Sequence, residues 1–129
     1  MLRITSIFMI IAALLAFFTI TQAAVIEKRG SYSGHATFYS VKKSGKPSCG
    51  GKYNNNDLVV ALSHKRMPKG HGKPCGKKIR VKGPKGSVRV KVVDTCAGCS
   101  KNHIDLSPKA FEKIAKKKTG RVDVTWSFE

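Results

Sequence analysis

The chain has 129 residues, a length typical of one domain, and 41% of them are hydrophobic. Its 25 Lys and Arg residues against 7 Asp and Glu residues give a formal net charge of +18, which predicts attraction to polyanions such as acidic polysaccharide, anionic membrane or nucleic acid. Specific nucleic-acid binding is not expected, because no aromatic stacking platform is interleaved with the lysines.

The N-terminal residues predict a targeting segment rather than part of the fold. Arg3 precedes the apolar run Ile7–Ile20, and Ala23 ends a small-residue pattern of the kind that signal peptidase cleaves. A membrane anchor is the alternative, but the run is short for a span and no basic stop-transfer cluster follows it closely. We therefore expect residues 1–23 to be a signal peptide, the protein to be secreted, and no membrane span.

A dibasic pair, Lys28 and Arg29, follows the predicted cleavage site. Kexin-type proteases cut such pairs in secretory pathways, so residues 24–29 are a candidate propeptide. An ordinary charged pair in a loop is the alternative. The folded domain is expected to span residues 30–129.

Four stretches have the patterns of β-strands. Gly34–Tyr39 combines aromatic and β-branched residues, and the continuous apolar run Leu58–Leu62 indicates a strand buried on both faces. Lys78–Lys82 alternates apolar and basic residues, and a turn over Gly83–Gly86 joins it to a strand that begins at Val88. Several short strands and no long loop favour a small β-barrel.

The strand that begins at Val88 leads to the first of two aspartates. Alternate valines over Val88–Val92 indicate a strand buried on one face, and by this alternation Asp94 falls on the same face. We expect Asp94 at the rim of the barrel. A turn that contains Cys96 and Cys99 then returns the chain to Asp105, which lies between two apolar residues.

One short helix is expected over about residues 108–118. Ser107 suits its N-cap and Pro108 its first position. Three lysines followed by Gly120 favour its end, because cations suit the negative end of the helix dipole and glycine suits the residue beyond it. A last strand over Arg121–Phe128 alternates polar and apolar residues.

Four cysteines in a small secreted domain indicate two disulfides, for which three connectivities are open. Cys96, Cys99 and His103 could suggest a zinc site, and the two cysteines alone a redox dithiol. A tetrahedral zinc site would need a fourth ligand, and the other cysteines lie far off in sequence. We expect disulfides, with no metal and no other cofactor.

Five short motifs resemble, in this order, those of double-psi β-barrel proteins. This group includes expansins, rare-lipoprotein-A-like domains, barwin-like plant defence proteins and fungal expansin-like secreted proteins, of which the single-domain fungal subgroup is the most similar. The resemblance implies a mainly β fold, a six-stranded double-psi β-barrel with one short helix and a groove across its rim. The motifs are Gly34–Tyr39, Cys75–Ile79, Val92–Cys96, His103–Ser107 and Val124–Trp126.

The resemblance also implies a polar cluster that contacts wall glucans. Asp105 corresponds to the general acid of family 45 endoglucanases, whereas Ser40 stands where those enzymes carry a catalytic base. An inverting hydrolase needs two carboxyl groups roughly 6.5–9.5 Å apart, and Asp94 is the other candidate. The expected substrate-binding residues are Thr37, Tyr39, Asp94, His103 and Asp105.

Each of these residues also has a purely structural interpretation. Asp94 could accept backbone N–H bonds where its strand ends, and Asp105 could favour the helix dipole. Tyr39 could pack in the core or rim, and His103 could be a solvated turn residue.

We expect the disulfides Cys49–Cys75 and Cys96–Cys99. The resemblance to barwin-like proteins supports the first pair. The second would fix the turn between the two aspartates.

The resemblance implies a secreted, monomeric expansin-like protein that binds cell-wall polysaccharide, including acidic polymers, and loosens it without hydrolysis. The chain ends three residues after Trp126, so no second carbohydrate-binding domain is expected. One alternative is a cysteine-protease inhibitor or a defence or effector protein, because a small secreted bacterial papain inhibitor of this fold is similar. Another is a weak polysaccharide hydrolase or lytic enzyme.

Overall fold

The computed structural model describes residues 30–70 and 72–129. The predicted signal peptide over residues 1–23 and the candidate propeptide over residues 24–29 lie outside this range. Within the described residues, no helix has the length and apolar character that crossing a membrane requires.

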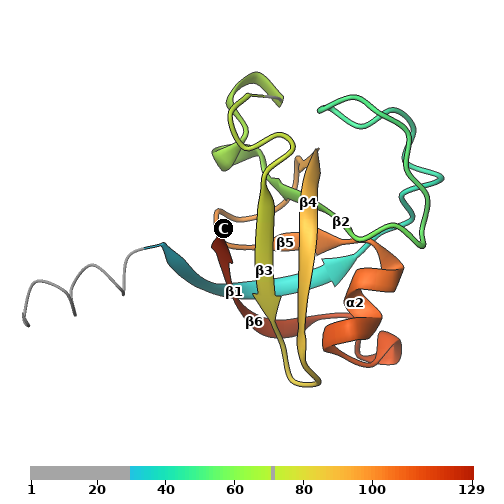
Figure 1. Ribbon diagram of the computed structural model, residues 1–129, viewed down its shortest axis with the longest axis vertical. Coiled ribbons are helices and arrows are strands. Elements are labelled where there is room, and N and C mark those ends of the chain that lie inside the picture. The colour runs from blue at the N-terminus through green and yellow to red at the C-terminus, as the bar shows by residue number, and fades with distance from the viewer. Residues whose placement is uncertain (1–29, 71) are drawn as a thin grey trace, which may run out of the picture. The chain divides into compact units, whose positions relative to one another are not determined.

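Six strands close into a barrel (Figure 1). Around the barrel they follow the order β1-β5-β2-β4-β3-β6. The pairs β1–β5 and β2–β4 are parallel, and the other neighbours are antiparallel. This closed, mixed barrel confirms the predicted fold class. The strands are β1 (Ser31–Phe38), β2 (Val59–Ser63), β3 (Lys78–Lys82), β4 (Ser87–Cys96), β5 (Ile104–Leu106) and β6 (Val122–Phe128).

Two apolar clusters lie on opposite sides of β2. Val60 and Leu62 are fully buried in the main core, which fills the barrel interior. Val59 instead packs on the outside with Val41 and Val93. All five residues of β2 are buried, as the continuous apolar run predicts.

The helix α2 (Pro108–Ile114) is shorter than the predicted range of 108–118. Its N-terminus is as expected, because Ser107 Oγ accepts a hydrogen bond from the Ala110 N–H. At the other end Ala115 is extended, with φ −160° and ψ 168°. The Ile114 carbonyl accepts a hydrogen bond from the Lys85 N–H of the β3–β4 hairpin at 2.8 Å, so tertiary contacts end the helix before the lysine run.

Three short 3₁₀ helices complete the described secondary structure. They are η1 (His64–Arg66), η2 (Pro68–Gly70) and η3 (Lys117–Thr119). Gly120 follows η3 with a positive φ of 73°, a conformation that glycine adopts without steric cost.

Two disulfides hold the loops at one end of the barrel. Cys49 is bonded to Cys75, and Cys96 to Cys99, with Cα–Cα distances of 5.5 and 5.4 Å. These are the pairs expected from the sequence. Because Cys96 and Cys99 share a disulfide, their sulfurs are not thiolates that could bind zinc.

Candidate functional site

A β-bulge in β4 decides which way Asp94 faces. Val92 pairs with Val60, but the next pair is Asp94 with Ala61, so Val93 is an extra residue. Paired residues share a face of the sheet, and Val60 faces the interior, so Ala61 and Asp94 face outward. The prediction that Asp94 shares the inward face of the valines is therefore wrong, because one inserted residue reverses the alternation.

The same register places the two aspartates on either side of Ala61. Ala61 pairs with Asp94 of β4 and with Asp105 of β5. Because neighbouring strands lie about 4.8 Å apart, the two aspartate Cα atoms are about 10 Å apart on the outer face. The small side chain of Ala61 leaves the space between them open.

We call the resulting surface cavity the acidic hollow. It has a volume of about 360 Å³. Its described lining residues come from β2, β4 and β5, from the loop that follows β1 and from the turn that follows β4. They are Tyr39, Ser44, Lys46, Ala61, Asp94, Thr95, Cys96, Ala97 and Asp105.

Asp94 is held by the backbone around it. Its Oδ1 accepts hydrogen bonds from the Ser48 N–H at 3.0 Å and from the Thr95 N–H at 2.8 Å. These bonds match the structural interpretation of Asp94, in which it accepts backbone N–H bonds where its strand ends. Asp94 also lines the hollow. Within the described part of the chain, Oδ2 receives no hydrogen bond, so it remains available to a ligand.

Asp105 is held from behind by a hydrogen-bonded chain. Thr37 Oγ1 donates to Asp105 Oδ1 at 2.9 Å, and His103 Nε2 lies 2.9 Å from the same Thr37 oxygen. Because the hydroxyl has one hydrogen, which goes to Asp105, Nε2 is the donor to Thr37. Burial raises the pKa of Asp105, and the Thr37 bond partly opposes that rise.

His103 is kept neutral by its surroundings. Burial lowers its pKa, and the charges of Arg121 and His35 lower it further. Neither Thr37 nor His103 is among the described residues that line the hollow. Their predicted contact with substrate stays a prediction. Thr37 bonds directly to Asp105, and His103 reaches Asp105 only through Thr37.

Tyr39 carries a buried hydroxyl without a hydrogen-bond partner among the described residues. Burial raises its pKa, and the negative charges of Asp94 and Asp105 raise it further, so the phenol keeps its proton. A buried donor that stays unpaired costs free energy. Tyr39 lines the hollow, but its oxygen is shielded from solvent, so a ligand oxygen could become its partner only after the side chain shifts.

Ser40, at the position of the family 45 base, does not line the hollow within the described residues. Its Oγ accepts bonds from the Lys43 N–H and from Asn55 Nδ2, both at 3.4 Å. It therefore helps to shape the loop that follows β1.

Sequence reasoning missed Ala61 and Lys46 as lining residues. Ala61 stands in a continuous apolar run, which gives no sign of which residues face outward. The doublet Val92–Val93 breaks the alternation of β4, and it was the available sign of the bulge.

A larger hollow of about 640 Å³ lies along β1, β3 and β6. Its described lining includes one carboxylate, Asp123, which is 92% exposed and lies 3.0 Å from His35. It holds no facing pair of acids, so we place the candidate site at the acidic hollow instead. Among the described residues, no three His, Cys, Asp or Glu side chains are grouped to hold a metal ion.

The acidic hollow is suited to hydroxyl-rich ligands. Asp94 Oδ2 accepts hydrogen bonds, and Tyr39 donates one when its buried hydroxyl is uncovered. Asp105 donates when it is protonated and accepts when it is ionised. Sugars present the matching hydroxyl groups.

Three known proteins are similar to this chain. The EG45-like domain containing protein of Citrus jambhiri is 33% identical over 123 residues, which cover 83% of this chain and 90% of that protein. The papain inhibitor of Streptomyces mobaraensis is 33% identical over 102 residues, or 74% of this chain and 70% of that protein. Expansin-YoaJ of Bacillus subtilis (strain 168) is 38% identical over 52 residues, 40% of this chain, and the chain spans 22% of that expansin.

Two solved structures share the fold. A mutant expansin of Clavibacter michiganensis in complex with cellohexaose has a TM-score of 0.69 at 30% identity, over 77% of this chain and 50% of that one. The Streptomyces papain inhibitor has the same TM-score and identity, over 78% of this chain and 94% of that one. Membership of the single-domain fungal subgroup stays a prediction.

A family model described as lytic transglycolase matches residues 31–126, nearly the whole barrel. The match agrees with the closed six-stranded sheet and with the relatives above. The chain therefore belongs to the double-psi β-barrel family.

Proposed function

We propose that this protein acts outside the cell, where it binds cell-wall polysaccharide in the acidic hollow and loosens it without hydrolysis. The observation that carries the proposal is the pairing of Asp94 and Asp105 on either side of Ala61, facing one cavity. The complex of a related expansin with cellohexaose supports a β-linked glucan as the kind of ligand.

Each polar group has a part in this proposal. Asp94 accepts hydrogen bonds from sugar hydroxyls, and Tyr39 donates one from its unpaired hydroxyl. Thr37 and His103 position Asp105 from behind. Such contacts compete with the bonds between neighbouring glycan chains, which is how binding alone loosens a wall.

The absence of hydrolysis follows from the proposed roles of these residues. An inverting hydrolase needs a base that activates water opposite the general acid. Ser40, which stands where that base would be, bonds to its own loop and does not line the hollow, and in this proposal Asp94 accepts sugar hydroxyl groups. We therefore assign Asp105 a binding role rather than a catalytic one.

A cysteine-protease inhibitor is the second candidate function. The observation that favours it is the extent of the match to the papain inhibitor, which spans 94% of that solved chain, against 50% of the expansin chain. Titration of papain with equimolar protein tests it. Complete loss of protease activity at a ratio of about one to one would support this function, and unchanged activity would exclude papain as a target.

The glycan proposal is tested by Asp105→Asn, which keeps the shape of the side chain and removes its charge. The variant should lose at least about tenfold of the binding to insoluble glucan and all measurable wall weakening, whereas soluble sugar release should be at background for both proteins. Asp123→Asn is the matched control, because Asp123 lies on another face. Equal activity of the wild type and Asp105→Asn would contradict the proposal, and sugar release by the wild type would contradict its non-hydrolytic part.

A further inference from the structure

A second cavity, which we call the cationic hollow, lies next to the acidic one. It has a volume of about 400 Å³ and is formed by the loop that follows β1. Lys46 lines both cavities, so the two are neighbours on the surface. Two aspartates and Lys46 line the acidic hollow. The cationic hollow is instead lined by Lys46 together with Lys42 and Lys52.

No acid balances these lysines within the described part of the chain. The described lining of the cationic hollow contains no Asp or Glu, and none of its three lysines forms an ion pair with a described residue. Three ammonium groups around one cavity repel each other and attract an anion.

The loop that carries the lysines is anchored at several points. The Cys49–Cys75 disulfide fixes its middle, and the Cys49 N–H donates to the Val93 carbonyl at 3.1 Å. Val41 is buried against Val59 and Val93. The Lys42 N–H donates to Asn55 Oδ1 at 3.2 Å, so the backbone positions of the lysines are preset.

Tyr53 gives the cationic hollow an aromatic wall. Its hydroxyl accepts a hydrogen bond from Lys91 Nζ at 3.1 Å, which holds the side chain in place. Its ring lies close against Gly51, where a Cβ would come within 2.9 Å of a ring carbon. An aromatic ring beside cations suits a sugar ring that carries a negative group.

We propose that the cationic hollow binds a carboxylated sugar unit of the same glycan chain whose neighbouring units occupy the acidic hollow. The inference rests on the proposed function and names its substrate class, a polysaccharide that carries uronic acid units. A neutral sugar would leave the charges of Lys42, Lys46 and Lys52 unpaired, whereas a carboxylate in the cavity they line would be attracted to them.

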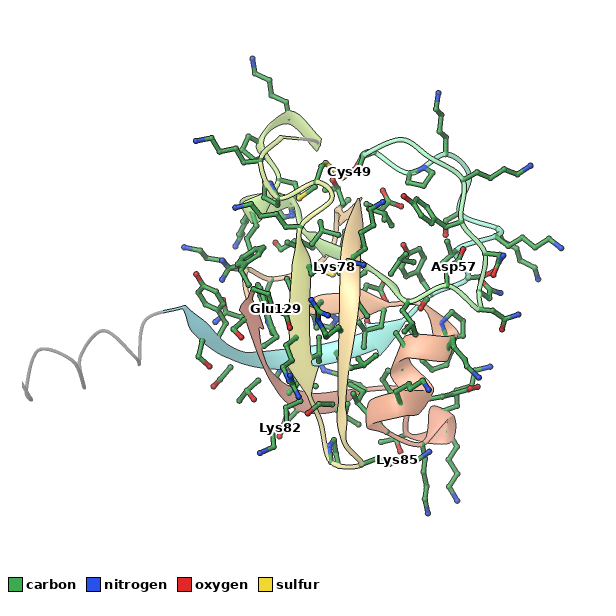
Figure 2. All side chains as sticks on the ribbon, viewed as in Figure 1. Cys49, Asp57, Lys78, Lys82, Lys85 and Glu129 are labelled. Carbon is green, nitrogen blue, oxygen red and sulfur yellow. A yellow bond between two sulfur atoms is a disulfide. The ribbon has the colours of Figure 1, made fainter. Side chains whose placement is uncertain are left out.

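The test compares two ligands with the same backbone, cellohexaose and its counterpart oxidised to carboxylate at C6. The pocket variant is Lys42→Gln with Lys52→Gln. The control is Lys85→Gln with Lys113→Gln, which removes the same charge from a different surface cavity. Figure 2 shows Lys85 at the far end of the barrel from Cys49, which belongs to the loop of the cationic hollow.

Affinities are measured by titration calorimetry at one fixed salt concentration. The wild type should bind the oxidised ligand about tenfold more tightly than cellohexaose, and the pocket variant should lose most of this preference while the control keeps it within about twofold. Equal losses in both variants, or no preference in the wild type, would overturn the inference while leaving the proposed function intact. Failure of both ligands to bind would instead defeat the proposed function and this inference with it.

Discussion

At the scale of single residues, the acidic hollow holds two carboxyl groups in different surroundings. Asp94 is bonded to backbone N–H groups, whereas Asp105 is half-buried and bonded to a threonine hydroxyl. Between them the Tyr39 hydroxyl has no partner among the described residues. The family resemblance predicted the two aspartates as site residues, and Tyr39 was predicted as an aromatic residue that contacts a sugar. The unpaired state of the phenol depends on packing, which no local pattern encodes.

Tyr39→Phe should separate stability from binding. Because the variant removes a buried donor without a partner, the free energy of unfolding should rise by about 1 kcal/mol, while glucan affinity falls about fivefold. Tyr53→Phe is the control, since it loses the bond from Lys91 and should lower the free energy of unfolding. Urea unfolding measures the free energy of unfolding of both variants. A loss of more than about 1 kcal/mol in Tyr39→Phe would mean that its hydroxyl has a structural partner.

The titration of Asp105 should report its burial. Its folded pKa is raised above the ordinary value of 3.8, so the folded state holds the proton to higher pH than the unfolded chain. The stabilisation that this proton gives the folded state is complete at pH values below 3.8. It is lost as the pH rises through the folded pKa of Asp105. The ¹³C shift of the Asp105 carboxyl carbon gives the midpoint by NMR. A midpoint below the ordinary value would contradict the burial argument.

At the scale of elements, the alternation of apolar and polar residues predicted most strands and their inward faces. The predicted strand Lys78–Lys82 matches β3 to the residue, and the predicted strand Arg121–Phe128 begins one residue before β6. Prediction failed where long-range contacts intervene. The bulge at Val93 depends on the register with β2, and the early end of α2 depends on the bond from Lys85 to Ile114.

Gly34 in β1 permits a close approach that no other residue allows. A Cβ at this position would overlap the Asn102 carbonyl, which also accepts a hydrogen bond from Trp126 Nε1 at 3.0 Å and so cannot easily move. Gly34→Ala should therefore lower the free energy of unfolding by about 1–3 kcal/mol. Gly98→Ala, with no atom within 4 Å of its new Cβ, should change it by less than about 0.5 kcal/mol. Similar values for the two variants would refute this packing.

At the scale of the whole molecule, a chain with a net charge of +18 keeps an acidic cavity on its surface. The composition predicted attraction to polyanions, and the family motifs predicted the barrel and its two aspartates. Neither could place the cationic hollow beside the acidic one, because that arrangement depends on how the loop after β1 folds back through the Cys49–Cys75 disulfide.

The most direct test of the central claim is an NMR titration of the ¹⁵N-labelled protein with cellohexaose. We predict that the largest amide shift changes fall on Tyr39, Ala61, Asp94 and Asp105, and that Asp94→Asn combined with Asp105→Asn abolishes them. Changes centred instead on His35 and Asp123, in the larger hollow along β1 and β6, would contradict the account. Saturating cellohexaose without any shift change would contradict it as well.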